Sequence, residues 1–271
     1  MVAALVAVAA IAAAPAEDKG FLTVATLFAA AAGLSATSIG VFGGVLVPGL
    51  LLLDVDPRVA APLSLFLQVL VIPIGATTHH AMGHVKRHIT VPLVICGVIG
   101  SVSGALFASS VPRELVGQGV AVVIIVVGII VLGTLRTGYA AGTVDHEEVH
   151  RGRIGAIGLV SGFASGISGA GWGPIGVKLL ILSRIDPRHA IGSSLVGRIF
   201  MAAAAIATYA LTAAAFGDIG VDPLLVIALL AGAIAAMIPG AAVIARLGRD
   251  RAAASIAVIS ICLALPSLLG R

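Results

Sequence analysis

The sequence predicts an all-α, polytopic membrane protein, and three observations lead to that fold class. Hydrophobic residues make up 59% of the 271 positions and charged residues only 10%, too little charge for the surface of a soluble domain of this size. Residues 21–53, 91–110 and 116–135 form apolar runs that match or exceed the roughly 20 residues that a membrane-crossing helix needs. The runs lack the alternation of strands, and a bilayer requires internally hydrogen-bonded backbone, so helices are expected.

The first 14 residues are rich in Ala and Val and precede a charged stretch that ends at Lys19. As a helix they would extend about 21 Å, which is short for a crossing. Ala14-Pro15-Ala16 could be a signal cleavage site, but no basic region comes before the apolar run. We expect residues 1–19 to hold a retained short hydrophobic helix.

A duplication at an offset of 130 residues organises the rest of the chain. Residues 35–65 align without gaps on residues 165–195, and 12 of the 31 positions are identical. The matching Leu and Val residues follow from composition, but the shared Asp-Pro-Arg-x-Ala at Asp56 and Asp186 does not. The period is far too long for a solenoid, so the pattern indicates a two-fold duplication.

Each copy has the same predicted order of elements. A helix is followed by a Gly-rich break, an apolar piece of about nine residues, a polar turn and three longer helices. Nine helical residues extend about 14 Å, so the short pieces are predicted to be re-entrant or half helices. We therefore divide the chain into residues 1–19, a first repeat at 20–135, a polar linker at 136–153 and a second repeat at 154–271.

Loop charges predict that the two repeats are inverted relative to each other. The loop at residues 79–88 contains Lys86 and Arg87, whereas its counterpart contains Asp218 and Asp222. Cytoplasmic loops are enriched in Lys and Arg, so loops of opposite character are expected on opposite sides of the membrane. Five elements per copy, an odd number, give the same inversion. A parallel duplication with irregular loop charges is the alternative.

Several functional classes are disfavoured by what the sequence lacks. The net charge is +4 and the isoelectric point 9.6, but the basic residues lie mainly in inter-helix loops and form no nucleic-acid-binding stripe. Cys96 and Cys262 lie within apolar runs, where inert thiols are expected. No phosphate-binding Gly-Lys-Ser/Thr loop, HExxH or Gly-x-Ser-x-Gly motif is present. We expect no enzyme activity, metal or cofactor.

Two cations lie outside the loops. Lys178 falls in the short apolar piece of the second copy, and Arg198 lies well inside the following helix, near the expected bilayer midplane. The acidic residues are all expected in loops or near the chain start. An uncompensated buried cation is costly, so its partner is backbone carbonyls, water, Asp186 or an anionic substrate. The guanidinium fork of arginine suits an oxyanion with several oxygens.

The repeat makes this positive charge one-sided, because Lys178 replaces Pro48 and Arg198 replaces Gln68. Half-helix N-termini at the Gly-rich breaks would offer free N–H groups to an anion. Trp172, the one Trp, has a pocket or gate role or a packing role there. The predicted substrate-binding set is Arg198, Lys178, Gln68, Ser38, Gly43, Gly44, Ser64, Ser168, Gly171, Trp172, Gly173 and Ser194.

Histidines cluster after the second long helix of the first copy. His80, His84 and His88 recur at steps of four, a spacing that can bind zinc on a helix, but Gly83 interrupts it and no Cys or acid adds a ligand. An interfacial loop is therefore favoured over a metal site. We expect His79 and His80 to act in gating or proton transfer.

Both copies carry motifs that resemble the sulfite exporter TauE/SafE family over nearly the whole chain from Phe21. In the first half these are the Gly-Val-Phe-Gly-Gly-Val-Leu-Val-Pro segment at 40–48 and the His-Ala-Met-Gly-His-Val segment at 80–85. In the second half they are residues 168–174 and 186–194. The resemblance implies a permease of the prokaryotic cytoplasmic membrane for sulfite, sulfonates such as sulfoacetate, or related anions. Lys178 departs from the uncharged residue usual in the family.

The main hypothesis is an alternating-access transporter of a small anion, with its site between the two breaks at the midplane. Its partners would be the lipid bilayer, the anion and, if transport is coupled, protons; the protein would be a monomer or a dimer. The alternatives are a passive anion channel, and a membrane scaffold or His-based metal-binding protein.

Overall fold

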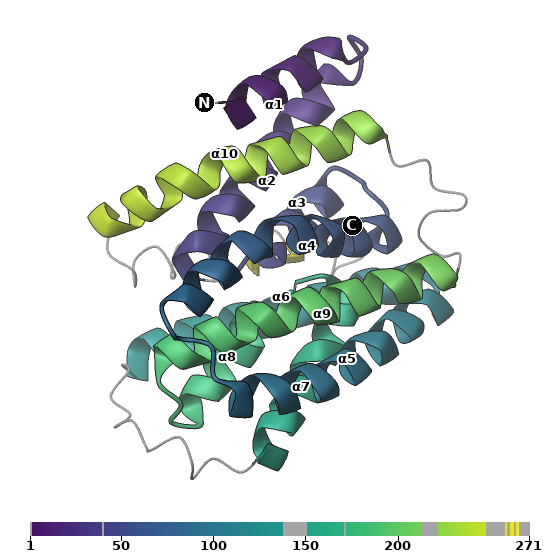
Figure 1. Cartoon of the computed structure of the whole chain (residues 1–271). Coiled ribbons are helices and arrows are strands. Elements are labelled where there is room, and N and C mark those ends of the chain that lie inside the picture. The colour runs from purple at the N-terminus through teal and green to yellow at the C-terminus, as the bar shows by residue number, and fades with distance from the viewer. Residues whose placement is uncertain are drawn as a thin grey trace.

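The computed structural model describes residues 2–39, 41–137, 151–170, 172–212 and 222–247, with residues 258, 261, 262, 264 and 265 near the C-terminus. Its helices form a bundle, and no strand occurs in the described ranges (Figure 1). The helices are α1 (Val2–Ala13), α2 (Lys19–Ile39), α3 (Gly43–Leu52), α4 (Pro57–Ala81), α5 (Arg87–Ser110), α6 (Arg113–Thr137), α7 (Arg151–Ser168), α8 (Trp172–Leu182), α9 (Pro187–Leu211) and α10 (Pro223–Leu247).

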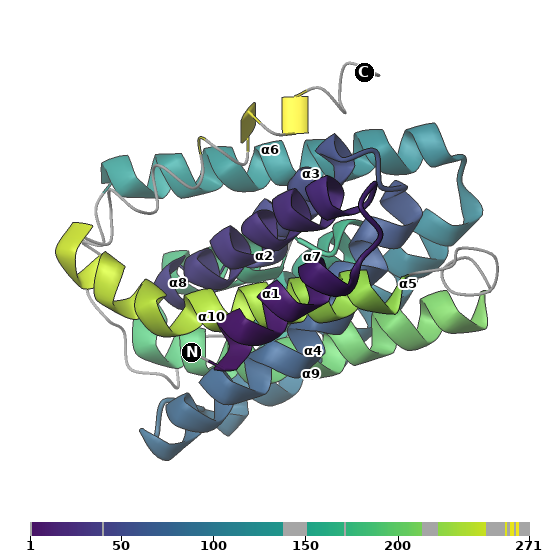
Figure 2. The ribbon, with the colours of Figure 1, turned by 90° about the horizontal axis from the view of Figure 1, so that it is seen from above.

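Four of these helices contain segments long and apolar enough to cross a membrane: Lys19–Ala36, Pro57–Ala81, Arg87–Ser110 and Arg188–Leu211. The predicted all-helical class is therefore confirmed. The short helices α3 and α8 have 10 and 11 residues, or about 15 Å, which is half of a bilayer core. The N-terminal segment is helical, as expected, and α1 packs on α10 (Figures 1 and 2).

Several element boundaries differ from the sequence prediction. The short helices begin inside the Gly-rich breaks, so Gly43 and Gly44 form the first turn of α3, and Trp172 and Gly173 that of α8. At Gly43 the close approach of another backbone, described below, requires glycine and overrides its low helix propensity. Glu114, expected in a loop, lies in the first turn of α6, where an acid favours the helix dipole.

The second copy and the linker are described only in part. Residues 138–150, most of the predicted linker, lie outside the described residues, and so does most of the chain after Leu247. Within the described ranges α2, α3, α4 and α5 have the same order and similar lengths as α7, α8, α9 and α10. The division into two repeats stays a prediction.

The most extensive helix pairings join the two copies. The α5 helix of the first copy packs along α7 of the second, and α10 of the second packs along α2 of the first (Figure 1). These two pairs correspond to each other if the copies are exchanged. In both pairs a later helix of one copy, α5 or α10, packs along the first helix of the other copy, α7 or α2.

Glycine permits the close contact of α5 with α7. A Cβ atom on Gly100 or Gly104 would lie 2.2 or 2.3 Å from a carbonyl oxygen of α7, and one on Gly162 or Gly166 would meet a carbonyl of α5 equally closely. Real Cβ atoms do not approach so near, so no other residue fits without a backbone shift. Gly100 and Gly104, and likewise Gly162 and Gly166, are spaced four residues apart, the spacing typical of close helix packing in membranes.

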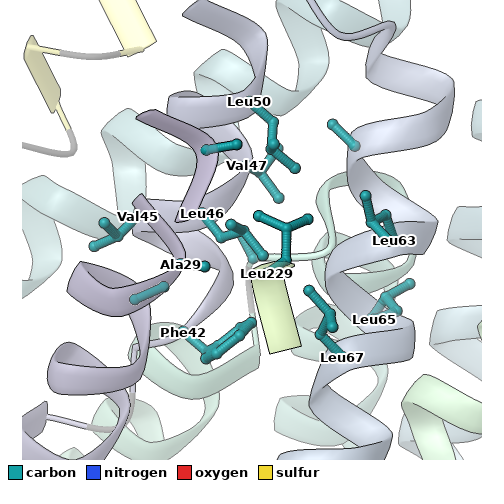
Figure 3. Close-up of a cluster of buried hydrophobic side chains, with 14 of the residues drawn as sticks. Ala29, Phe42, Val45, Leu46, Val47, Leu50, Leu63, Leu65, Leu67 and Leu229 are labelled. Atoms are coloured by element: carbon teal, nitrogen blue, oxygen red, sulfur yellow. The ribbon is translucent and has the colours of Figure 1, made fainter. Parts of the chain in front are cut away.

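An apolar cluster surrounds α3, the short helix of the first copy. Leu46 and Leu50 of α3 are fully buried against leucines of α4 and α10, and Leu229 comes from the second copy (Figure 3). The face of α4 that carries Leu63 and Leu67 points into this cluster (Figure 3). Ser64 and Gln68 of α4 lie outside this cluster and hydrogen-bond to Gly169 of the second copy.

The α4 and α9 helices pack against each other in opposite directions. Gln68 meets Arg198, whereas His84, just beyond α4, meets Gly192 in the first turns of α9. As residue numbers increase along α4 and just beyond it, the numbers of the α9 residues that are contacted decrease, so the two helices are antiparallel. The middle of this crossing brings together two residues that are 130 positions apart.

Candidate functional site

The two polar turns have the same backbone conformation. Asp54 follows α3 with φ 58°, and Arg184, 130 positions later, follows α8 with φ 66°. They are the non-glycine residues with positive φ in the described part of the chain, and left-handed backbone is uncommon for side-chain-bearing residues. The same rare conformation at equivalent positions extends the likeness of the copies from sequence to local structure.

The shared Asp-Pro-Arg motif starts the next helix in both copies. A side-chain oxygen of Asp56 accepts a hydrogen bond from the backbone N–H of Arg58 at 2.8 Å, and Asp186 accepts one from Arg188 at 2.8 Å. Each carboxylate also lies at the positive end of its helix. The two motifs fix the start of α4 and α9, and with it the depth of the residues that follow.

The Gly-rich breaks of the two copies touch. A Cβ atom on Gly43 would lie 2.1 Å from the carbonyl oxygen of Gly169. Gly169 itself has φ +64°, and a Cβ atom there would lie 2.5 Å from the carbonyl oxygen of Ala61. Gly43 therefore requires glycine for lack of space, and Gly169 requires it for both its conformation and the space. The start of α3 and the end of α7 meet where the predicted site was expected.

Gln68 links this contact to α9. Its Nε2 donates to the carbonyl oxygen of Gly169 at 2.8 Å and to Ser64 Oγ at 3.3 Å. Ser64 Oγ donates to the same carbonyl at 3.2 Å. Ala61, Ser64 and Gln68 are spaced to lie on one face of α4, and all three contact Gly169.

The remaining atom of the Gln68 amide meets the buried cation. Arg198 Nη2 donates to Gln68 Oε1 at 2.6 Å. Arg198 lies near the middle of the 25-residue α9 and is 5% exposed, the one charged side chain that is buried in the described ranges. The structure thus brings together four of the predicted site residues: Gly43, Ser64, Gln68 and Arg198. The expected alternative partner, Asp186, caps the start of the helix instead.

The other predicted serines make local hydrogen bonds. Ser168 Oγ donates to the carbonyl of Ala164 at 2.7 Å and accepts from the N–H of Ala170 at 3.1 Å, which stabilises the end of α7. Ser194 Oγ donates to the carbonyl of its own helix at Ile191. Lys178 is half-buried on α8.

Parts of the predicted site lie outside what the structure describes, namely the side chains of Ser38 and Trp172 and the whole of Gly171. The predicted set omitted Gly169, whose carbonyl accepts from both Ser64 and Gln68. The signal that could have found it was its place in the Gly-rich break, directly after Ser168.

A histidine cluster lies at one end of the α4–α9 pair. The α4 helix continues to Ala81, so His79 and His80 are helical rather than in the predicted loop. His79 Nδ1 lies 3.2 Å from His84 Nδ1, and the ring of His84 lies 6.5 Å from that of His189. His80 is exposed and makes no such contact in the described structure.

The loop after α4 is docked onto α9. The backbone N–H of Lys86 donates to Ser193 Oγ at 3.0 Å. A Cβ atom on Gly192 would lie 2.9 Å from the carbonyl oxygen of His84, so the loop and helix backbones are in direct contact. No group of three or more metal-ligating side chains suitable for an ion occurs among the described residues.

Comparison with known proteins assigns the chain to a transporter family. The family model for the sulfite exporter TauE/SafE matches residues 25–266. A curated relative from Bacillus subtilis, the probable membrane transporter protein YtnM, is 28% identical over 202 residues, which cover 73% of this chain but 66% of the relative. No solved structure matches. The match extends over both copies and the site between them, and the chain therefore belongs to the sulfite exporter TauE/SafE family of membrane transporters.

Proposed function

We propose that the protein carries a small sulfur oxyanion, such as sulfite or a sulfonate, across the membrane and that Arg198 binds it. The observation that supports this most strongly is a buried guanidinium in the middle of a candidate membrane-crossing helix, joined through Gln68 to the contact between the two Gly-rich breaks. A buried cation at that depth indicates an ion pathway. The family indicates a sulfur-containing substrate. The buried cation indicates that this substrate is negatively charged.

The two repeats are inverted about an axis that passes between Gln68 and Arg198. Equivalent helices that pack antiparallel are related by a two-fold rotation perpendicular to their length, and α4 and α9 pack in this way. If both helices cross the membrane, the axis lies in its plane, as in transporters with inverted repeats. The reciprocal pairing of α5 with α7 and of α10 with α2 supports the same relation.

The anion binds to the guanidinium and to neutral donors around it. Two oxygens of a sulfite or sulfonate group can accept from one arginine fork. Ser64 and Ser194 lie one helical turn before Gln68 and Arg198, and on binding their hydroxyl groups turn from the carbonyls of Gly169 and Ile191 to the anion. The first turns of α3 and α8 supply N–H groups and the positive end of a helix dipole. Lys178, half-buried on α8, adds a weaker attraction because its charge is less desolvated than that of Arg198.

Transport follows from exchanging the conformations of the two copies. In this structure α9 packs closely along α5, whereas α4 and α10, the corresponding pair, touch only briefly. The two copies are therefore packed differently although their sequences are similar. In an alternating-access cycle the other state would pack α4 on α10 and separate α5 from α9.

The histidine cluster closes the cytoplasmic end of the pathway. The loop that docks on α9 carries Lys86 and Arg87, and short loops rich in such residues face the cytoplasm. A proton gained by His79 would change its contact with His84, whose Nδ1 lies 3.2 Å from its own, and with it the docking of the loop. Proton-linked gating thus rests on His79, while the exposed His80 has a minor role.

Transport by purified protein in liposomes tests the proposal. Sulfite or sulfoacetate uptake should saturate with concentration, as a carrier requires and a passive channel does not. Replacing Arg198 with Gln should reduce anion affinity by about 10- to 100-fold, since hydrogen bonds to a charged group contribute about 1.5–3 kcal/mol. Arg188→Gln, on the same helix but exposed, is the matched control. Unchanged affinity in the Arg198 variant would refute the assigned role, and Lys178→Gln should have the smaller effect.

A further inference from the structure

Gln68 and Arg198 lie on either side of the proposed two-fold axis, where each residue of an inverted repeat meets its own counterpart. They are 130 positions apart, which is the offset of the duplication, and they are joined by a hydrogen bond of 2.6 Å. Two arginines in this position would repel, and two glutamines would provide no charge. A single cation with a neutral acceptor is the combination that keeps both a stable core and an anion site.

The hydrogen bonds of Gln68 fix which way its amide points. Nε2 donates to the Gly169 carbonyl at 2.8 Å, an atom that can only accept, so Oε1 must face Arg198. A neutral amide oxygen is a weaker partner for a guanidinium than an anionic oxygen. Gln68 therefore offers only a modest acceptor to Nη2 of Arg198. An oxyanion would bind the same donor more strongly.

We propose that Gln68 is a displaceable internal partner of Arg198, whose amide oxygen is exchanged for an oxygen of the transported anion. This inference rests on the proposed function and gives Gln68 a different part from that of a direct ligand. Without anion, Gln68 neutralises part of the cost of the buried cation. With anion, the bond to Arg198 breaks while the bond to Gly169 remains available.

The same exchange connects the binding site to the helix break. Gln68 joins Arg198 on α9 to the Gly169 carbonyl, which lies against Gly43 at the start of α3. Removing the Arg198 end of this chain of contacts frees the side chain to move with α4. Anion occupancy is thereby communicated to the point where the breaks of both copies touch, the region that has to rearrange during transport.

The experiment measures anion affinity and thermal stability of purified Gln68→Met protein, using sulfite and sulfoacetate as probes. Met has similar length but offers no acceptor to Arg198. We expect lower thermal stability without anion, anion affinity raised about 3- to 10-fold, and a larger stabilisation on adding anion, because the competing partner has been removed. The matched control is Gln118→Met, the same change at an exposed position of α6.

Equal or lower affinity in Gln68→Met would overturn the proposal, because a direct ligand or a purely structural residue gives that result. If the Met variant does not fold, Gln68→Asn replaces it: the shorter side chain cannot reach both Gly169 and Arg198, so affinity should again rise, and a fall overturns the proposal. Arg198→Gln is measured alongside. Loss of binding there with no gain in the Gln68 variants rejects only the exchange, whereas full binding there rejects the proposed anion site itself.

Discussion

The two halves of the molecule have the same local backbone conformation around their Asp-Pro-Arg motifs but differ in the charge of the helix that follows. Asp54 and Arg184 end the short helices in the same left-handed conformation, and Asp56 and Asp186 cap the next helices in the same way. In the first copy the middle of the following helix carries a neutral amide, and in the second copy a buried arginine. The proposed anion site therefore lies at equivalent positions of the two copies, and its charge comes from a position at which they differ, Gln68 in the first and Arg198 in the second.

The packing differs between the halves as well, and locking that difference should have the largest effect. Thr212 Oγ1 lies 3.1 Å from Ser109 Oγ, where α9 and α5 end side by side. In a chain whose two native cysteines are replaced by Ala, a disulfide between Ser109→Cys and Thr212→Cys should hold α5 on α9. We expect sulfite flux to fall to the level of empty liposomes while anion binding persists.

Reduction of that disulfide should restore flux, and each single cysteine variant should transport before and after oxidation. Undiminished flux in the fully cross-linked protein would show that α5 and α9 stay together throughout transport. In that case the packing difference between the copies would be static, and the exchange of conformations would have to be abandoned.

The contact between the breaks should tolerate no added methyl group. Gly43→Ala would place a carbon 2.1 Å from the Gly169 carbonyl, and overpacking of this kind typically costs 1–3 kcal/mol, about enough to lower the melting temperature by several degrees. The same change at Gly20, where a Cβ atom meets nothing within 4 Å, serves as the control. Thermal unfolding in detergent measures both, and equal melting temperatures would mean that the breaks do not touch.

Removing the two helix caps should lower the melting temperature least of all these changes, and by a similar amount in the two copies. Asp56→Ala and Asp186→Ala each remove one side-chain hydrogen bond to a helix N-terminus, at a cost of about 1 kcal/mol. Because the two motifs have the same geometry, their melting temperatures should fall by similar amounts. A loss confined to one variant would indicate that the copies have diverged in local structure as well as in charge.

Much of the fold could be predicted from the sequence because its signals are local or repeated. Long apolar runs predict the helices, and the shared Asp-Pro-Arg motif reveals the duplication. The helix starts at Gly43 and Trp172 were missed. Glycine has a low helix propensity, and the presence of Gly43 in a helix reflects its tertiary contact with Gly169, which the sequence does not show.

The site could be predicted only as a list of residues. The sequence offset shows that position 68 corresponds to position 198, but not that these residues touch, since that depends on where α4 and α9 cross. Gly169 contributes a backbone carbonyl, which carries no residue-type signature. The contact of His84 with His189 likewise depends on the antiparallel packing of two helices that are far apart in sequence.

The most direct test of the account moves the charge to the other copy. Arg198→Gln alone should abolish most of the stabilisation that sulfite confers on the purified protein. In the double variant Gln68→Arg with Arg198→Gln, the cation and its amide partner trade places across the axis, so sulfite should again raise the melting temperature, toward the wild-type value. A folded double variant that responds to sulfite no better than Arg198→Gln alone would contradict a site built on the symmetry axis.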